Sequence, residues 1–189
     1  FYEHSGIDLR GTIRAMAYLG KKGGASTISQ QLAKQLFHKE KTRGIERYTQ
    51  KIKEWVIATR LEKQYTKEEI LAMYFNIYDF NNNADGIRSA AKIYFDKDPK
   101  QLKIEEGSML VGMFKNSALY NPIRNHQGVI NRRNVVLAQM LKNNYITQEQ
   151  KDSLQQLPLK IKFTPESHND GIATYFREYL RSYMKNWIE

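Results

Sequence analysis

The chain has 189 residues, of which 41% are apolar and 26% are charged, enough for one domain with a buried core of its own. With 11 glycines, 4 prolines and no cysteine, the composition excludes a disordered chain, a collagen-like repeat and a disulfide-stapled miniprotein. Lysine and arginine number 30 against 20 acidic residues, so the net charge of +10 favours nucleic acid, anionic lipid or a pyrophosphate as partner. No apolar run approaches the length of a membrane span, and no signal peptide is visible.

Helical periodicity dominates the chain, and only one short stretch alternates like a strand, so the expected fold class is mainly α. A helix is predicted over residues 8–19, ending at the glycine-rich stretch 20–24. A second helix is predicted to begin near Ser26 or Thr27. Its wheel separates an apolar side from a polar one, with the apolar side formed by Ile28, Leu32, Leu36 and Phe37 and the polar side by Thr27, Gln30, Gln31 and Lys34.

Two further helices are predicted before residue 80. Residues 38–50 are polar and basic and read as an exposed loop or a loosely held helix. From Ile52 to Leu61 apolar residues occur on all sides, which is typical of a buried helix. Thr66 and Glu69 have the spacing of a capping box, and the helix after them has a packing face of Ile70, Leu71, Tyr74 and Phe75.

The second half continues as short helices joined by turns. Three consecutive asparagines, 81–83, predict a turn, and helices are expected over 86–95, 104–114 and 129–142, with a last one capped at Thr147. Pro158 and Pro165 bracket an alternating stretch that predicts a short strand or an extended linker. The final segment has an aromatic stripe that we expect to pack on the preceding domain; the alternative is that it awaits a missing neighbour. Its members are Ile172, Phe176, Tyr179, Leu180, Tyr183 and Trp187.

The glycine turn at residues 23–26 is the first candidate for chemistry. Small residues running into a helix let backbone N–H groups approach an anion at the positive end of the helix dipole. Gln30, Gln31 and Lys34 follow on the same side and could add donors and a cation. The alternative, equally supported by spacing, is that Thr27 and Gln30 form a capping box and the other side chains are solvated.

Glu54 is the second candidate, because it shares a face with the apolar residues Ala58 and Leu61. Either it forms a structural salt bridge with Lys51, three residues earlier, or it lies at a cleft wall where partial burial tunes its protonation. The pattern favours the salt bridge. The four histidines are scattered and no HExxH motif occurs, so a tightly held metal is not expected, and His4 is interpreted as a structural hydrogen-bonding residue.

Taken in order, five segments resemble the motifs of the peptidoglycan glycosyltransferases, family 51, of class A penicillin-binding proteins. Residues 1–8 match the second half of the first motif, 24–34 the second, and 51–54 the third, with Gln50 where that family has arginine. Residues 86–95 and 106–122 resemble the fourth and fifth. The resemblance covers the chain from Phe1 to about Phe163.

This resemblance implies a lysozyme-like fold with two lobes, in which a cleft separates a globular lobe from a smaller, membrane-facing lobe. It also implies the substrate lipid II. The 4-hydroxyl of one lipid-linked disaccharide would attack the anomeric carbon of the growing chain and release undecaprenyl pyrophosphate with inversion. Such a reaction needs a base for the hydroxyl and positive charge for the departing pyrophosphate.

The resemblance also implies residue roles. Glu54 becomes the second catalytic carboxylate, while Lys34 and Lys51 stabilise negative charge. The donor would be held by Ser26, Gln30 and Gln31, and the cleft motifs include Phe1, His4, Gly24 and Gly86. Of these, Gly86 is expected mainly to shape the fold, as is Glu106 of the fifth motif. The only cofactor implied is a loosely bound Mg²⁺ or Mn²⁺ at the pyrophosphate, with no organic cofactor.

The family's general base lies four residues before the phenylalanine that is Phe1 here, so we expect the base upstream of this sequence and impaired polymerisation by this stretch alone. The glycosyltransferase domain is expected over 1–157, truncated at its N-terminus, and a linker with the start of a junction to a transpeptidase domain over 158–189. A membrane anchor is expected before Phe1, and the domain is expected at the extracytoplasmic (periplasmic) face of the bacterial cytoplasmic membrane. Expected partners are lipid II, the growing glycan and the membrane surface, and not nucleic acid.

Three other functions stay open at this point. The chain could be a relative of lysozyme that cleaves peptidoglycan. Such an enzyme would have the same fold but would need no site that binds pyrophosphate. A basic helical module could bind nucleic acid through charge alone, although the chain contains no recognisable nucleic-acid motif. A degenerate glycosyltransferase domain could persist as a scaffold.

Overall fold

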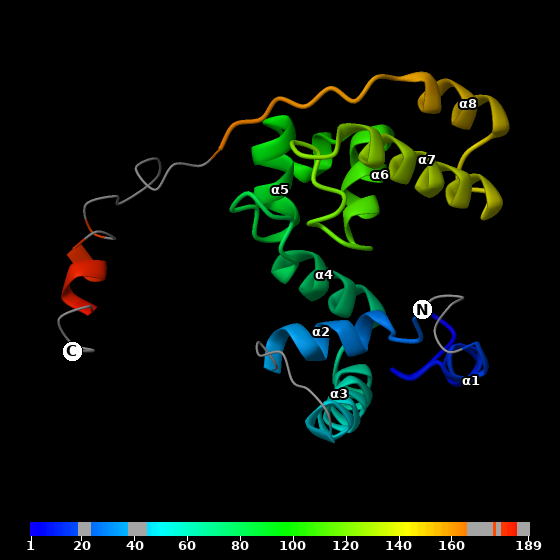
Figure 1. Ribbon diagram of the computed structural model, residues 1–189, viewed down its shortest axis with the longest axis vertical. Helices are drawn as coiled ribbons and strands as arrows, with labels where there is room; N and C mark the ends of the chain where they lie inside the picture. Colours follow the sequence, from blue (N-terminus) through cyan, green and yellow to red (C-terminus); the bar gives the residue numbers. More distant parts are fainter. Residues whose placement is uncertain (19–23, 38–44, 166–175, 177–178, 185–189) are drawn as a thin grey trace. The chain divides into compact units, whose positions relative to one another are not determined.

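The computed structural model describes residues 1–18, 24–37, 45–165, 176 and 179–184, and within these ranges every regular element is helical (Figure 1). The mainly α fold class is therefore confirmed. The elements are α1 (Leu9–Ala17), α2 (Ile28–Phe37), α3 (Ile45–Gln64), α4 (Lys67–Ile77), α5 (Gly86–Phe95), the short 3₁₀ helix η1 (Pro99–Gln101), α6 (Ile104–Met113), α7 (His126–Lys142) and α8 (Gln148–Gln156).

The chain divides into two compact units, each with its own contacts. Unit 1 contains residues 1–79 and 85–87, and unit 2 contains residues 80–84 and 88–189. All candidate site residues named above except Glu106 fall in unit 1.

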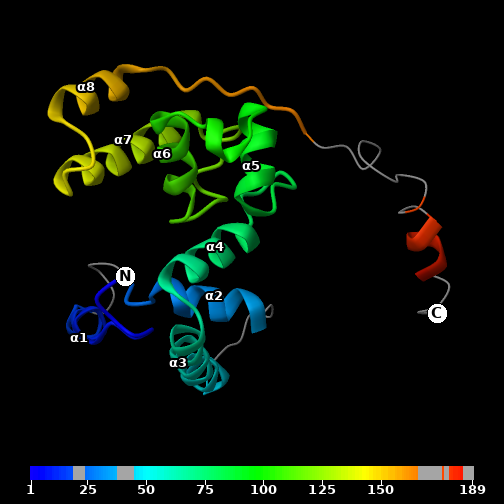
Figure 2. The same cartoon turned by 180° about the vertical axis from the view of Figure 1, so that it is seen from behind.

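Unit 1 is built on α2, α3 and α4, which pack on one another (Figure 2). Its core consists of Leu32 and Ala33 from α2, Ala58 and Leu61 from α3, and Ile70 and Tyr74 from α4. The predicted capping box of α4 is present: the Thr66 hydroxyl accepts from the Glu69 N–H at 3.2 Å, and the Glu69 carboxylate accepts from the Thr66 N–H at 2.8 Å.

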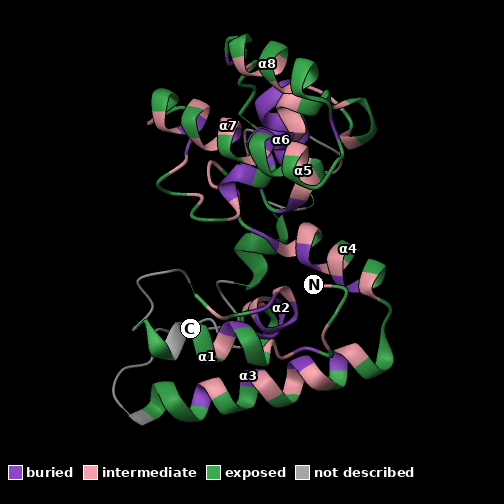
Figure 3. Ribbon diagram, turned by 90° about the vertical axis from the view of Figure 1, so that its right-hand side faces the viewer, coloured by how far each residue is buried: buried purple, intermediate pink, exposed green. Residues whose placement is uncertain are grey.

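The prediction that residues 52–61 form a helix buried on all sides is wrong. The helix α3 runs from Ile45 to Gln64, and Ile52 and Val56 are 59% and 49% exposed. Figure 3 shows exposed, intermediate and buried stretches alternating along α3. Only the side that carries Glu54, Ala58 and Leu61 is covered, because α2 and α4 are the described helices that α3 contacts. For residues 38–50 the sequence left open a loop or a helix. Residues 45–50 are helical, and residues 38–44 lie outside the described part.

The polar and apolar sides predicted for α2 also need correction. The buried residues of α2 are Ser29, Gln30, Leu32 and Ala33, whereas Leu36 and Phe37 are exposed. Ser29 and Gln30 can be buried because both side chains have hydrogen-bond partners, as described below. Periodicity alone cannot recognise a buried polar residue whose partner comes from elsewhere in the sequence.

Unit 1 also contains α1, whereas unit 2 contains most of α5 together with η1, α6, α7 and α8, and α6 packs on α7 and α8. Its core draws on α5, α6 and α7 and includes Ala91, Ile93, Tyr94, Met109, Leu110, Met113, Val129 and Leu137. The helices predicted over 86–95, over 104–114 and after Thr147 are confirmed. The helix α7 begins three residues earlier than predicted, because the Asn125 side chain accepts from the Gly128 N–H at 3.0 Å and caps it.

Residues 158–165 are extended and form no strand, so the strand alternative is wrong and the linker role stays a prediction. The N–H groups of Lys162 and Thr164 donate to the carbonyls of Tyr94 and Ile93 at 3.0 and 2.8 Å. The aromatic stripe that follows does not pack as predicted: Phe176, Tyr179 and Tyr183 are exposed, while Ile172 and Trp187 lie outside the described residues. Among the described helices, none has the length and apolar content needed to cross a bilayer.

Candidate active site

The N-terminal segment, residues 1–7, approaches α3 through Gly6. Gly6 has φ +91°, and a Cβ there would lie 3.0 Å from the backbone carbonyl of Ala58, so only glycine fits. Its carbonyl oxygen accepts two hydrogen bonds from the start of α2, one from the Thr27 hydroxyl at 2.7 Å and one from the Gln30 amide at 3.0 Å. Residues 1–7 therefore contact α3 by close packing at Gly6 and contact the start of α2 by hydrogen bonds.

Thr27 caps α2, as the capping alternative required, but Gln30 does not complete the box. The Thr27 hydroxyl oxygen accepts from the Gln30 N–H at 3.2 Å. The Gln30 side chain is 1% exposed and donates to Gly6 instead of returning to Thr27. Gln30, expected to hold the donor substrate, therefore has its amide nitrogen occupied inside the protein and positions residues 1–7.

Glu54 lies where its face predicted, buried to 5% exposure on the inner side of α3. Its Oε2 accepts from Lys51 Nζ at 2.8 Å and its Oε1 from the Gln50 amide at 3.2 Å. The predicted i, i+3 salt bridge is therefore present, and it is made by a carboxylate that is almost completely buried. The cleft-wall alternative stays a prediction.

Lys51 joins this carboxylate to the loop before α2. Its Nζ also donates to the Ser26 hydroxyl at 3.0 Å, and its side chain is 37% exposed. The structure thus brings together Ser26, Lys51 and Glu54 from two segments 25 residues apart. The Lys51 ammonium is thus paired with a buried carboxylate and a hydroxyl. Because it is also partly exposed, an anion from solvent can contact it while these two contacts remain.

Gly24 precedes this cluster in the loop that leads into α2. It is exposed, and a Cβ there would meet no atom within 4 Å, so packing does not require glycine at this position. On α2 itself, Gln31 accepts a hydrogen bond from the Tyr74 hydroxyl at 2.9 Å, and burial raises the pKa of Tyr74. Lys34 is exposed and makes no ion pair with any described residue. No described contact joins Lys34 to Glu54, although their two helices pack together.

Phe1 and His4 are held by a lysine from α4. Lys67 Nζ donates to the His4 carbonyl at 2.5 Å and lies 4.4 Å from the centre of the Phe1 ring. The Phe1 ring meets the His4 ring edge to face, with the ring centres 6.0 Å apart. His4 Nδ1 accepts from the Gly6 N–H at 3.2 Å, which agrees with the structural role expected for it.

The same lysine closes a network that the sequence analysis missed. Lys67 Nζ pairs with Glu62 Oε2 at 2.5 Å, and the other oxygen of Glu62 accepts from the Ser29 hydroxyl. The side chain of Glu62 is 5% exposed. The signal was present in the spacing, because residues 54, 58 and 62 are four apart and lie on one face of α3. Partial burial, and next to it the charge of Lys67, lower the pKa of His4 below its ordinary value.

Gly86 and Glu106, expected mainly to shape the fold, have structural contacts. Gly86 has φ +79°, and a Cβ there would lie 2.4 Å from the carbonyl oxygen of Asn76. Its N–H donates to Tyr78 O at 2.9 Å. In unit 2, Glu106 accepts from Lys97 Nζ at 2.6 and 2.8 Å and from the Lys103 N–H at 2.8 Å.

The comparisons with known proteins agree with these motifs. The family model described as "Transglycosylase" matches residues 1–141. The chain is 35% identical to penicillin-binding protein 1A of Aquifex aeolicus and 38% identical to penicillin-binding protein 1A of Escherichia coli, in both cases over 98% of its length. It is 37% identical to penicillin-binding protein 2a of Streptococcus pneumoniae over 79% of its length. It spans 25%, 22% and 20% of these three relatives.

A similar solved structure is that of penicillin-binding protein 1A from Haemophilus influenzae, at 25% identity and a TM-score of 0.48. The match covers 83% of this chain and 20% of that one. The family model covers well over half of the present sequence and includes the segments that contain Ser26, Lys51 and Glu54. The chain therefore belongs to the transglycosylase family, as its five ordered motifs indicated.

Proposed function

We propose that this chain is the domain that polymerises glycan strands of peptidoglycan from lipid II by inverting glycosyl transfer, and that the cluster of Ser26, Lys51 and Glu54 serves the leaving group. The observation that carries the proposal is the position of Lys51, whose ammonium contacts both Glu54 and Ser26 while remaining 37% exposed. A site that binds pyrophosphate needs a cation that is fixed in position and accessible to the ligand, and Lys51 meets both requirements.

In the proposed reaction, the 4-hydroxyl oxygen of the acceptor sugar forms a bond to the anomeric carbon of the donor. The bond between that carbon and the pyrophosphate oxygen breaks, and its electron pair leaves with undecaprenyl pyrophosphate. The hydroxyl proton passes to a base, for which we propose the glutamate that the family resemblance places four residues before Phe1. This chain supplies positive charge for the leaving group through Lys51 and Lys34, together with the positive end of the α2 dipole.

Glu54 would hold Lys51 rather than transfer the proton itself. Both of its oxygens accept hydrogen bonds, and its side chain is almost completely buried. A buried carboxylate that accepts a hydrogen bond from an ammonium fixes the position of that ammonium. Gln50, at the position of the family's arginine, adds a neutral donor to the same carboxylate, so this site has one cation fewer than the motif implies.

The described residues do not fit a metal held by the protein. No group of three or more His, Asp or Glu side chains in the described ranges could bind an ion. Glu54, the carboxylate of the cluster, already has both oxygens engaged. No step of the proposed mechanism depends on a divalent cation.

We place this reaction at the outer face of the cytoplasmic membrane, with lipid II, the growing glycan and the membrane surface as partners. The net charge of +10 supports attraction to anionic head groups and to pyrophosphate. The relatives are four to five times as long as the match, which supports a fused second domain, proposed to be a transpeptidase.

The test measures the turnover of fluorescent lipid II by the full-length parent protein that contains this chain. We expect Lys51→Met and Glu54→Gln each to lower turnover about 100-fold or more, because each removes a preorganised charge at the leaving group. Lys63→Met, an exposed lysine at the end of the same helix, is the matched control and should retain activity.

The rival functions give different results in the same experiment. A peptidoglycan-cleaving enzyme would digest purified glycan strands, and Lys51→Met would leave that digestion intact. A scaffold would turn over no lipid II even as the unmodified parent protein. Normal polymerisation by Lys51→Met would contradict the proposed role of the cluster.

A further inference from the structure

Unit 2 contains a cavity of about 160 Å³ that the proposed function does not use. Its walls come from the end of α5, the start of α6, the middle of α7 and residues 157–160; Figure 1 shows this last segment running from α8 towards α5. Its apolar lining is formed by Phe95 and Leu159, both nearly buried, together with Leu157 and Pro158. A cavity of this volume is large enough for a group the size of benzene.

Arg133 lines the cavity, and one of its buried side-chain nitrogens has no hydrogen-bond partner among the described residues. Its side chain is 1% exposed, with Nε donating to Asn134 Oδ1 and Nη2 to the Gln155 carbonyl, both at 3.2 Å. The remaining nitrogen, Nη1, is buried and makes no hydrogen bond. Buried polar groups in proteins almost always have a partner, and a guanidinium nitrogen can only donate. The missing partner is therefore an acceptor.

The charge around the cavity favours an anionic acceptor. Arg133, Lys103 and Lys160 contribute three positive charges. Glu106 also lines it, but its charge is matched by Lys97, which contacts both of its oxygens. Glu105 attracts Arg133 without a hydrogen bond between them, so the lining keeps a net positive charge.

We propose that this cavity binds a carboxylate attached to a small apolar group, with the carboxylate on Arg133 Nη1 and the apolar group against Phe95 and Leu159. Lys160, exposed at the rim, adds charge without being buried. Two sources share this chemistry: a free aromatic or aliphatic acid, and the C-terminal residue of a peptide. The inference does not depend on glycosyl transfer, because all of its residues lie in unit 2.

The probe is benzoate, and benzamide is its neutral counterpart of the same shape. Each compound is titrated into the full chain, and binding is followed by the NMR shifts of the Arg133 Nε–H and of the Leu159 backbone N–H. We expect benzoate to bind at least fivefold more tightly than benzamide. Lys160→Met should weaken benzoate binding about threefold, while Lys100→Met, an exposed lysine of the same unit outside the cavity, should not. Arg133→Lys should abolish binding, with thermal melts to check that the variant folds.

Equal shifts with benzoate and benzamide, or no shift with benzoate at 50 mM, would show that only water satisfies Arg133 and would overturn the proposal. An equal effect of Lys160→Met and Lys100→Met would also overturn it. A pair of hexapeptides ending in phenylalanine, one with a free and one with an amidated C-terminus, separates the two sources. Binding of the free form identifies a peptide terminus, and binding of benzoate alone identifies a small acid.

Discussion

At the scale of single residues, two glycines of the family motifs have opposite structural requirements. Gly86 has φ +79° and no room for a Cβ next to Asn76, whereas Gly24 has open space around it. We expect Gly86→Ala to lower the free energy of unfolding by about 2 to 4 kcal/mol, because both strain and a clash with backbone result. Gly24→Ala should leave it unchanged within about 0.5 kcal/mol. Urea denaturation measures both, and similar losses for the two variants would contradict this account.

The pKa of His4 leads to a prediction on pH. Because burial and Lys67 lower it in the folded protein, the unfolded chain binds more protons as the pH falls below about 6.5, and stability decreases. The contribution is fully present above pH 6.5 and is lost on acidification. We expect the melting temperature to fall between pH 7.5 and 5.5, with His4 as one source of the decrease.

His4→Asn is the matched variant for that measurement, because its side-chain oxygen can accept from the Gly6 N–H without titrating. Its melting temperature should change less than that of the unmodified chain over the same range. Equal slopes for the two proteins would exclude His4 as a source of the pH dependence.

At the residue scale, the sequence was sufficient to predict contacts and burial that depend only on other residues of the same helix. The burial of Glu54, its salt bridge with Lys51 and the capping boxes at Thr66 and Thr147 follow from spacings of three or four residues. The Glu62 to Lys67 pair was missed, although the spacing put Glu62 on the buried face, because its partners Ser29 and His4 come from other segments. Only the folded chain shows which distant group satisfies a buried charge.

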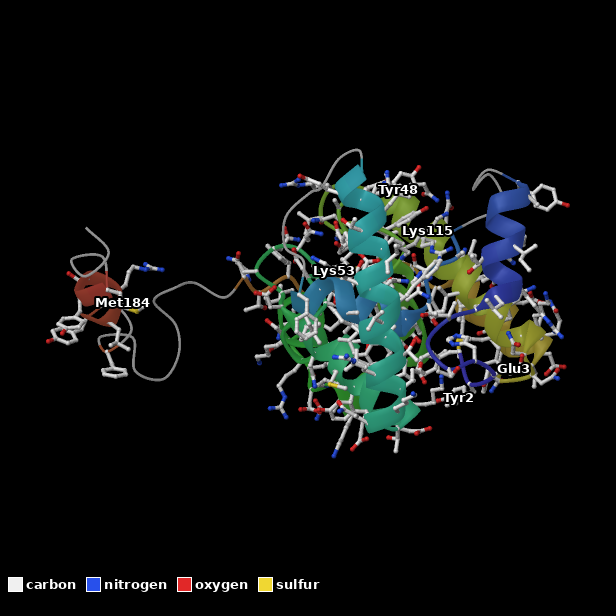
Figure 4. All side chains as sticks on the ribbon, turned by 90° about the horizontal axis from the view of Figure 1, so that it is seen from below. Tyr2, Glu3, Tyr48, Lys53, Lys115 and Met184 are labelled. Atoms are coloured by element: carbon white, nitrogen blue, oxygen red, sulfur yellow. The ribbon has the colours of Figure 1, made fainter. Side chains whose placement is uncertain are left out.

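At the scale of elements, α3 shows how apolar content can mislead. Figure 4 labels Tyr48 and Lys53, which leave α3 on opposite sides in that view, and Tyr48 is 76% exposed. Apolar residues on every side of a helix predict burial only if neighbours are available for every side. The described part of unit 1 provides α2 and α4 on one side, so Ile52 and Val56 stay exposed.

The extended segment after α8 is held to α5 by two backbone hydrogen bonds and by an ion pair between Lys162 and Asp96, just after α5. Asp96 accepts from Lys92 and from Lys162 Nζ, and these two lysines lower its pKa to about 2. We expect Asp96→Asn to speed hydrogen exchange of the Lys162 and Thr164 N–H groups about two- to fivefold, because an exposed ion pair contributes little. Asparagine tolerates the φ of +54° at this position.

The control for that exchange measurement is Asp152→Asn in α8. Asp152 is also an acidic residue whose pKa is lowered, by Gln148 and Lys151, but it does not contact the segment. Exchange at Lys162 and Thr164 should be unchanged in this variant. If both variants accelerate exchange equally, the effect comes from net charge and not from the Asp96 contact.

At the scale of the whole molecule, the charge of +10 and the exposed apolar residues of α1 and α3 predict binding to anionic membranes. We expect the chain to sediment with vesicles of phosphatidylglycerol and not with vesicles of phosphatidylcholine, and to be released by 0.5 M salt. The double variant Ile52→Ser, Val56→Ser should bind about tenfold more weakly, because it removes apolar surface that enters the interface.

Val135→Ser is the control, because Val135 is similarly exposed, at 46%, but lies on α7 in unit 2. An equal loss in this variant would mean that general hydrophobicity drives the binding. Binding to DNA or RNA that survives 200 mM salt would instead favour the nucleic-acid module.

The three contacts of Lys67 limit which substitutions evolution can accept at this position. One ammonium contacts a carboxylate, a backbone carbonyl and an aromatic ring in three directions, which suits three rotatable N–H donors. The planar fork of arginine cannot point in the same three directions. Among natural homologues of this chain, we therefore expect arginine to be rare at position 67, even though it is the usual replacement for lysine elsewhere on a basic surface.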